Sequence, residues 1–136
     1  MSKIVAIDYG LKRIGIAISD KSRIIAFGLS TIPNFEIIPY LTQIIKNEDI
    51  NLFVIGKPIQ KDNTPSDLEN EIILFVKKLN IIFPQIKIVR YDERFTSSIA
   101  KKTIIESGIN KTKRRNKELV DKISATLILQ SYLENK

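Results

Sequence analysis

Three acidic residues occupy positions where a carboxylate is costly. Asp8 ends an apolar stretch that is typical of a buried strand, and Glu93 follows another. Asp121 shares one face of a predicted helix with Ala125 and Ile128. A buried carboxylate costs free energy unless it is paired or binds a metal. Three together would repel one another without a divalent cation, and ligand sets of oxygen alone favour Mg²⁺ or Mn²⁺.

The residue types missing from the chain narrow the chemistry further. The sequence has neither histidine nor cysteine. This excludes Ser-His-Asp and Cys-His catalysis, disulfides and thiolate zinc sites. Carboxylates, lysines, hydroxyls and metals remain as the candidate chemistry.

Positive charge accompanies the acids. The chain has 22 Lys and Arg against 15 Asp and Glu, a net charge of +7, which favours polyanionic partners and above all nucleic acid. The cations closest in sequence to the acids, or clustered in the basic stretch before Asp121, are candidate phosphate contacts. They are Lys12, Arg13, Arg94, Lys111, Lys113, Arg114 and Arg115.

Each of these signals has a structural alternative. Asp8 could belong to an ordinary hairpin turn, and Glu93 to a surface patch of ion pairs with its neighbours. Asp121 lies near a helix N-terminus, where the helix dipole favours an acid without any function. The basic stretch from Asn110 to Lys117 could be a solvated loop, and the net charge could reflect composition alone. On the residues alone these alternatives stay open.

Periodicity predicts the elements that position these residues. Apolar runs indicate five strands and four helices. The strands are expected at 3–7, 14–19, 24–32, 51–55 and 86–89. The first helix follows Asn34 as a possible cap and starts or bends at Pro39. The second has Thr64 as its N-cap and Pro65 as its first helical position, and it carries Leu68, Ile72, Phe75, Val76 and Leu79. The third runs from Thr96 or Ser97 to Gly108, and the last from about Glu118 to Leu133.

This order predicts an α/β fold of one domain, residues 1–136. Three closely spaced strands form an antiparallel meander, and helical crossovers add two parallel strands. Parallel strands bring their carboxyl ends to one edge of a sheet, so Asp8 and Glu93 should meet there. No apolar run approaches the roughly 20 residues of a membrane span. A cytoplasmic protein without membrane contact is therefore expected.

Four stretches together resemble one known family. They are IDYGLKRIGIAISD (7–20), GKP (56–58), DERFTS (92–97) and VDKISATLILQSYL (120–133). In this order they resemble the YqgF family, also called RuvX, over essentially the whole chain. That family's fold is similar to ribonuclease H and to the RuvC Holliday-junction resolvase. Lys57, the loop at 60–63 and Ser124 depart from the family pattern.

The resemblance implies a nuclease that processes the 5′ end of pre-16S ribosomal RNA, with a ribonuclease H-like sheet covered by helices on both faces. The family's acidic site residues fall on Asp8, Glu93 and Asp121, which would hold one or two Mg²⁺ ions. The candidate cations would contact the phosphates of the RNA.

Other readings of the same residues remain. One is a resolvase of structured DNA, and another is a ribosome-assembly factor that binds RNA without cleaving it. An actin-like or sugar-kinase ATPase is disfavoured, because five glycines and 136 residues leave no room for its second domain and adenosine site. Either a monomer or a homodimer is compatible with the sequence.

Overall fold

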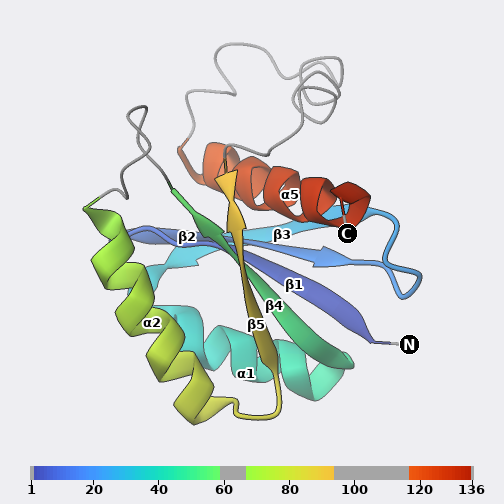
Figure 1. The fold of residues 1–136 in the computed structure, drawn as a ribbon, viewed down its shortest axis with the longest axis horizontal. Helices are drawn as coiled ribbons and strands as arrows, with labels where there is room; N and C mark the ends of the chain where they lie inside the picture. The colour runs from blue at the N-terminus through green and yellow to red at the C-terminus, as the bar shows by residue number, and fades with distance from the viewer. Residues whose placement is uncertain (1, 59–66, 94–116, 136) are drawn as a thin grey trace.

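One mixed sheet forms the centre of the fold. The computed structural model describes residues 2–58, 67–93 and 117–135, with the side chains of the last range from residue 123 onward. The strand order is β3-β2-β1-β4-β5 (Figure 1). The strands are β1 (Lys3–Asp8), β2 (Arg13–Ser19), β3 (Ala26–Pro33), β4 (Ile50–Lys57) and β5 (Lys87–Asp92). β1, β2 and β3 pair antiparallel, whereas β1, β4 and β5 run parallel, which confirms the predicted topology.

Helices cover both faces of this sheet. α1 (Ile37–Asn47) and α2 (Leu68–Ile82) lie on one face and α5 (Lys117–Asn135) lies on the other, as Figure 1 shows. A short 3-10 helix, η1 (Asn34–Glu36), precedes α1. The three layers match the α/β architecture expected from the sequence. No helix within the described ranges is long and apolar enough to cross a membrane.

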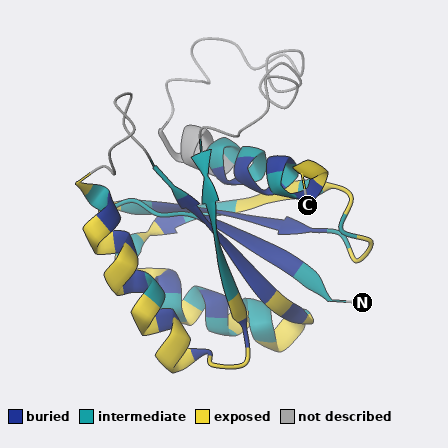
Figure 2. Ribbon diagram, in the orientation of Figure 1, coloured by how far each residue is buried: buried dark blue, intermediate teal, exposed yellow. Residues whose placement is uncertain are grey.

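The central strands β1 and β4 are buried on both sides, which explains their uninterrupted apolar runs (Figure 2). Alternate residues of each strand face opposite layers. Val5, Ile7, Phe53 and Ile55 pack with α1 and α2. Ile4, Ala6, Leu52 and Val54 pack with Ala125, Ile128, Leu129 and Leu133 of α5. The same alternation assigns Asp8 and Gly56, the next residues in phase, to the α5 face.

The turn before β3 corrects one predicted boundary. Ile24 was expected in the third strand, but the strand begins at Ala26. The carboxylate of Asp20 accepts hydrogen bonds from the backbone N–H groups of Ile24 and Ile25, at 2.7 and 3.0 Å. Arg23 has a positive φ of 59°. This local turn overrides the strand propensity of the two isoleucines.

The start of α1 corrects a second boundary. Asn34 does not cap the helix; its side-chain amide donates to the carbonyl of Gly10 (2.7 Å) and its backbone N–H to that of Lys12 (2.9 Å). α1 begins at Ile37, so Pro39 lies in its first turn, where a backbone N–H has no acceptor within the helix. The predicted N-cap Thr64, the predicted first helical residue Pro65 and the helix predicted over 96–108 lie outside the described residues.

Candidate active site

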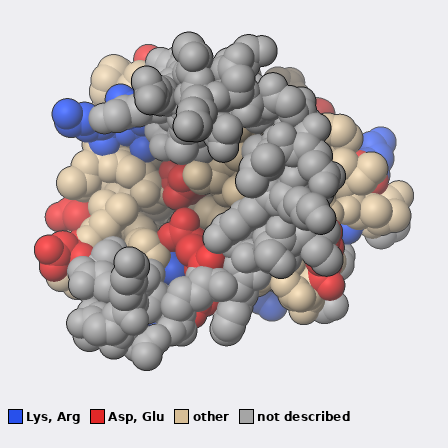
Figure 3. Space-filling model, turned by 90° about the horizontal axis from the view of Figure 1, so that it is seen from above, with Lys and Arg blue, Asp and Glu red and all other residues tan. Residues whose placement is uncertain are grey.

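Three parallel strands end together at one edge of the sheet. Both β4 and β5 continue past their predicted ends, because their pairing extends through Gly56 with Tyr91 and Lys57 with Asp92. Asp8 is the last residue of β1, and Glu93 directly follows β5. Figure 3 looks down onto the carboxyl ends of β4 and β5, and acidic side chains gather near the middle of that view. This edge carries two of the three predicted acids.

Asp8 of β1 and Gly56 of β4 are neighbours on adjacent strands. The parallel register pairs Ile7 with Ile55, so the next residues, Asp8 and Gly56, lie side by side. Asp8 is half-buried, and on the other side of β1 it pairs with Gly15 of β2. Asp8, on the central strand of the sheet, therefore lies between two glycine positions, Gly15 of β2 and Gly56 of β4.

Glu93 follows β5, so it approaches Gly56 of β4 from the side opposite to β1. A Cβ atom placed on Gly56 would lie 3.2 Å from Cδ and 3.3 Å from Cγ of Glu93, and 2.9 Å from Cδ1 of Ile128 in α5. A larger residue at this position would require the side chains of Glu93 and Ile128 to shift. Asp8 and Glu93 are therefore both neighbours of Gly56, one on the adjacent strand and the other through its side chain.

The surroundings of Glu93 disfavour its ionised form. Burial raises the pKa of Glu93; the positive charge of Arg90 lowers it in part, and the negative charge of Asp92 raises it further. A bound cation would offset this cost. The donor set also fits a hard divalent ion, since Asp8 and Glu93 offer only carboxylate oxygens.

Asp121 lies in α5, one turn before Ala125, and its side chain is outside the described residues. Ala125 and Ile128, expected on the same helix face as Asp121, are buried against the sheet. Among the side chains that the structure describes, no three acidic groups form a metal-binding cluster. The contribution of Asp121 to the site therefore stays a prediction.

The predicted phosphate contacts are described only in part. Lys12 is exposed in the connection between β1 and β2, and Arg13, the first residue of β2, is half-buried. This connection turns tightly at Gly10, where a Cβ would lie 2.5 Å from the backbone oxygen of Arg13. The other candidates lie outside the described residues: Arg94, Lys111, Lys113, Arg114 and Arg115.

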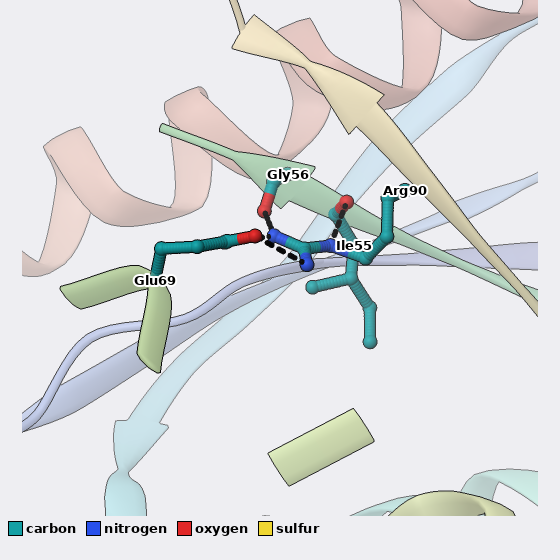
Figure 4. Close-up of polar contacts among 4 residues, drawn as sticks. All are labelled: Ile55, Gly56, Glu69 and Arg90. Atoms are coloured by element: carbon teal, nitrogen blue, oxygen red, sulfur yellow. Dashed lines mark hydrogen bonds and ion pairs between the residues drawn. The ribbon is translucent and has the colours of Figure 1, made fainter. Parts of the chain in front are cut away.

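Sequence reasoning missed one ion pair beside the site. Arg90 of β5 binds Glu69 of α2 and also reaches the end of β4 (Figure 4). Both residues lie in elements that are otherwise largely apolar on their inner faces. The sequence did contain a signal for this pair. Glu69 and Arg90 carry opposite charges at positions that face the interior, and each charge is costly there unless the other pairs with it.

Comparison with known proteins places the chain among nucleases. The family model RuvX, described as Holliday junction resolvase, matches residues 2–135. A Bacteroides fragilis protein named "Putative pre-16S rRNA nuclease" is 49% identical over 136 residues, 100% of this chain and 99% of its own length. Relatives of the same name from Flavobacterium johnsoniae (100% and 99% covered) and Porphyromonas gingivalis (99% and 98% covered) are each 46% identical.

Among solved structures, Thermus thermophilus RuvC in complex with Holliday junction substrate superposes with a TM-score of 0.60. The match covers 99% of this chain and 96% of RuvC, at 12% sequence identity. At this identity the likeness establishes a shared fold, and it confirms the RuvC-like, ribonuclease H-like architecture expected from the sequence.

Proposed function

This chain belongs to the RuvX family, and on that premise we propose that it is a nuclease that hydrolyses phosphodiester bonds in pre-16S ribosomal RNA. The relatives' shared name supplies the substrate. The strongest structural support is the arrangement of Asp8 and Glu93 on either side of Gly56. The proposal treats residues 1–136 as one nuclease domain that works in the cytoplasm on a ribosomal precursor.

In this proposal Asp8, Glu93 and Asp121 hold Mg²⁺ or Mn²⁺. When bound, the ion supplies an activated water and stabilises negative charge on the phosphate during an in-line displacement. The carboxylates fix the position of the ion. Glu93 is partly buried, and a carboxylate that is partly removed from water interacts more strongly with a cation.

The cations of the chain orient the RNA. Lys12 lies in the connection that follows Asp8, and Arg13 begins β2, so both are proposed to contact a phosphate bound at Asp8 and Glu93. Arg94 directly follows Glu93 and has the same proposed role. Lys111, Lys113, Arg114 and Arg115 would bind the backbone of the RNA away from the reacting phosphate.

A cleavage assay tests the function. The purified protein is incubated with labelled precursor RNA, unstructured RNA and four-way junction DNA, each with Mn²⁺ or with EDTA. We expect Mn²⁺-dependent cleavage of the precursor RNA, absent from Glu93→Gln. Preferential cleavage of the junction would instead support a DNA resolvase, as the description of the family model suggests. RNA binding without cleavage would indicate an assembly factor.

The salt dependence of RNA binding tests the basic segment. Neutralising Lys113, Arg114 and Arg115 should weaken binding and lower the salt slope by about 0.7 for each lost contact with single-stranded RNA. An unchanged slope would mean that these residues are an ordinary solvated segment.

A further inference from the structure

The edge of the sheet at which the parallel strands β1, β4 and β5 end is called the carboxyl edge below. It contains an ion pair that has no role in the proposed metal chemistry. We propose that Arg90 and Glu69 are positioning residues. They hold the end of β4, so that Gly56 keeps the side chain of Glu93 where it can bind the metal ion. The inference rests on the proposed function, because it takes Glu93 as a metal-binding residue. Neither Arg90 nor Glu69 needs to touch the RNA.

The contacts of Arg90 join three elements. Its Nη2 lies 2.6 Å from Oε1 of Glu69, and its Nη1 lies 3.1 Å from Oε2, so the pair is bidentate. The same Nη2 donates to the carbonyl of Gly56 (2.9 Å), and Nε donates to that of Ile55 (3.4 Å), as Figure 4 shows. Arg90 therefore ties the end of β4 to the first turn of α2.

The burial of the pair makes stability alone a weak explanation. The side chain of Glu69 is 8% exposed and that of Arg90 is 22% exposed. Removing two charges from water offsets most of what their attraction contributes, and apolar residues of similar size often serve as well. What apolar residues cannot supply is the planar, directional set of donors that Arg90 aims at two consecutive backbone carbonyls.

Gly56 connects this network to the acids. On one side its carbonyl accepts the hydrogen bond from Arg90. On the other side its Cα faces Glu93, whose side chain lies within contact distance of the place that a Cβ atom on residue 56 would occupy. A displacement of the β4 end would therefore change the support of Glu93 and the spacing between Glu93 and Asp8.

The experiment separates positioning from stability with an apolar double variant, Glu69→Leu/Arg90→Met. Its matched control is Lys3→Met/Glu48→Leu, which removes an ion pair of 2.9 Å at the opposite end of the sheet. Three quantities are measured: the melting temperature in EDTA, kcat and KM for RNA cleavage well below that temperature, and the Kd for Mn²⁺ from electron paramagnetic resonance.

We expect the apolar double variant to melt within a few degrees of the wild type. Its kcat should fall about 10- to 100-fold and its Mn²⁺ affinity should weaken by a similar factor, as for other residues that orient metal ligands. KM should change little, and the control should match the wild type in all three measurements. Wild-type kcat and Mn²⁺ affinity in the double variant would overturn the proposal.

A second variant covers the case in which the double variant does not fold. Arg90→Lys keeps the charge but loses the bidentate geometry, so a lower kcat is expected in a folded protein; a wild-type kcat would overturn the proposal. Mn²⁺ binding distinguishes this failure from failure of the proposed function. If the wild type binds Mn²⁺ but does not cleave RNA, the Mn²⁺ affinities of the wild type and the variants can still be compared. If the wild type neither binds Mn²⁺ nor cleaves RNA, both proposals are overturned.

Discussion

Asp20 and Glu93 lie at opposite ends of the same sheet, and their surroundings shift their pKa values in opposite directions. Asp20 lies in the turn after β2, where the N–H groups of Ile25 and Ile24 donate to its carboxylate and lower its pKa. Arg23 in the same turn donates to Ser2 and Asn51. Glu93 lies at the carboxyl edge, where burial raises its pKa.

The difference separates an acid that stabilises the fold from an acid held at a cost. Two backbone donors make the ionised form of Asp20 favourable within the protein itself. The ionised form of Glu93 is disfavoured by burial and by Asp92, and a bound cation would reverse that balance. The same residue chemistry therefore has a structural role at one end and a proposed catalytic role at the other.

The largest expected effect is on activity. Asp8→Asn, Glu93→Gln and Asp121→Asn should each abolish RNA cleavage while the protein stays folded, because each removes a ligand charge with little change in volume. Asp20→Asn is the control and should retain activity. Cleavage is measured with circular dichroism as a check on folding. Full activity in one of the three variants would remove that residue from the site.

The next effect concerns stability at the carboxyl edge. Arg90→Met alone should lower the free energy of unfolding by about 3 kcal/mol, because it leaves the carboxylate of Glu69 buried without its partner. For a domain of this size that is a loss of roughly 10 °C in Tm. Lys3→Met breaks a more exposed pair and should cost less than about 1 kcal/mol. Equal losses of unfolding free energy in Arg90→Met and Lys3→Met would show that the ion pairs at the two ends of the sheet contribute equally to stability.

Metal binding gives a smaller and more specific shift. At tenfold excess over Kd, Mg²⁺ should stabilise the wild type by about 1.4 kcal/mol, or roughly 2–8 °C in Tm. Asp121→Asn should melt higher than the wild type in EDTA, since it relieves repulsion among the acids, and should lose most of the metal-induced shift. If Asp121 only complements the helix dipole, its variant should melt lower in EDTA.

The smallest effect is the pH dependence of the two acids. The folded-state pKa of Glu93 is raised, so wild-type stability falls as pH rises above about 4.5, the ordinary pKa of a glutamate, until the folded-state pKa is passed. Glu93→Gln removes this loss and should melt higher than the wild type at neutral pH without metal.

Asp20 should behave in the opposite way. Its folded-state pKa lies below 3.8, so its contribution to stability is present above that pH and is lost in acid. Asp20→Asn should therefore melt lower than the wild type at neutral pH. Thermal melts from pH 3 to pH 8 compare both variants. Shifts of the same sign would contradict the contrast between the two ends.

Local patterns in the sequence predicted the sheet and two of its acids. The apolar runs located β1 and β4, and the rule for parallel strands brought Asp8 and Glu93 to one edge. Interactions between distant residues were harder to predict. The pair formed by Glu69 and Arg90 joins a helix to a strand 21 residues later, and no periodicity encodes that contact.

Boundaries failed where a side chain or a neighbouring strand outweighs local preference. Asp20 holds Ile24 in a turn although isoleucine favours strands. The amide of Asn34 binds the carbonyl of Gly10 and so does not cap a helix. β5 continues to Asp92, beyond its apolar residues, because β4 pairs with it there.

The position of α5 in the chain has a consequence for when the enzyme becomes competent. The strands β1, β2 and β3 can pair early because they are close in sequence. α5 leaves the ribosome only after all five strands, and until then Ile4, Ala6, Leu52 and Val54 lack their cover. The proposed third acid, Asp121, arrives with that helix. A chain in which α5 has not yet packed against the sheet therefore lacks both the cover of these apolar side chains and the proposed third acid of the site.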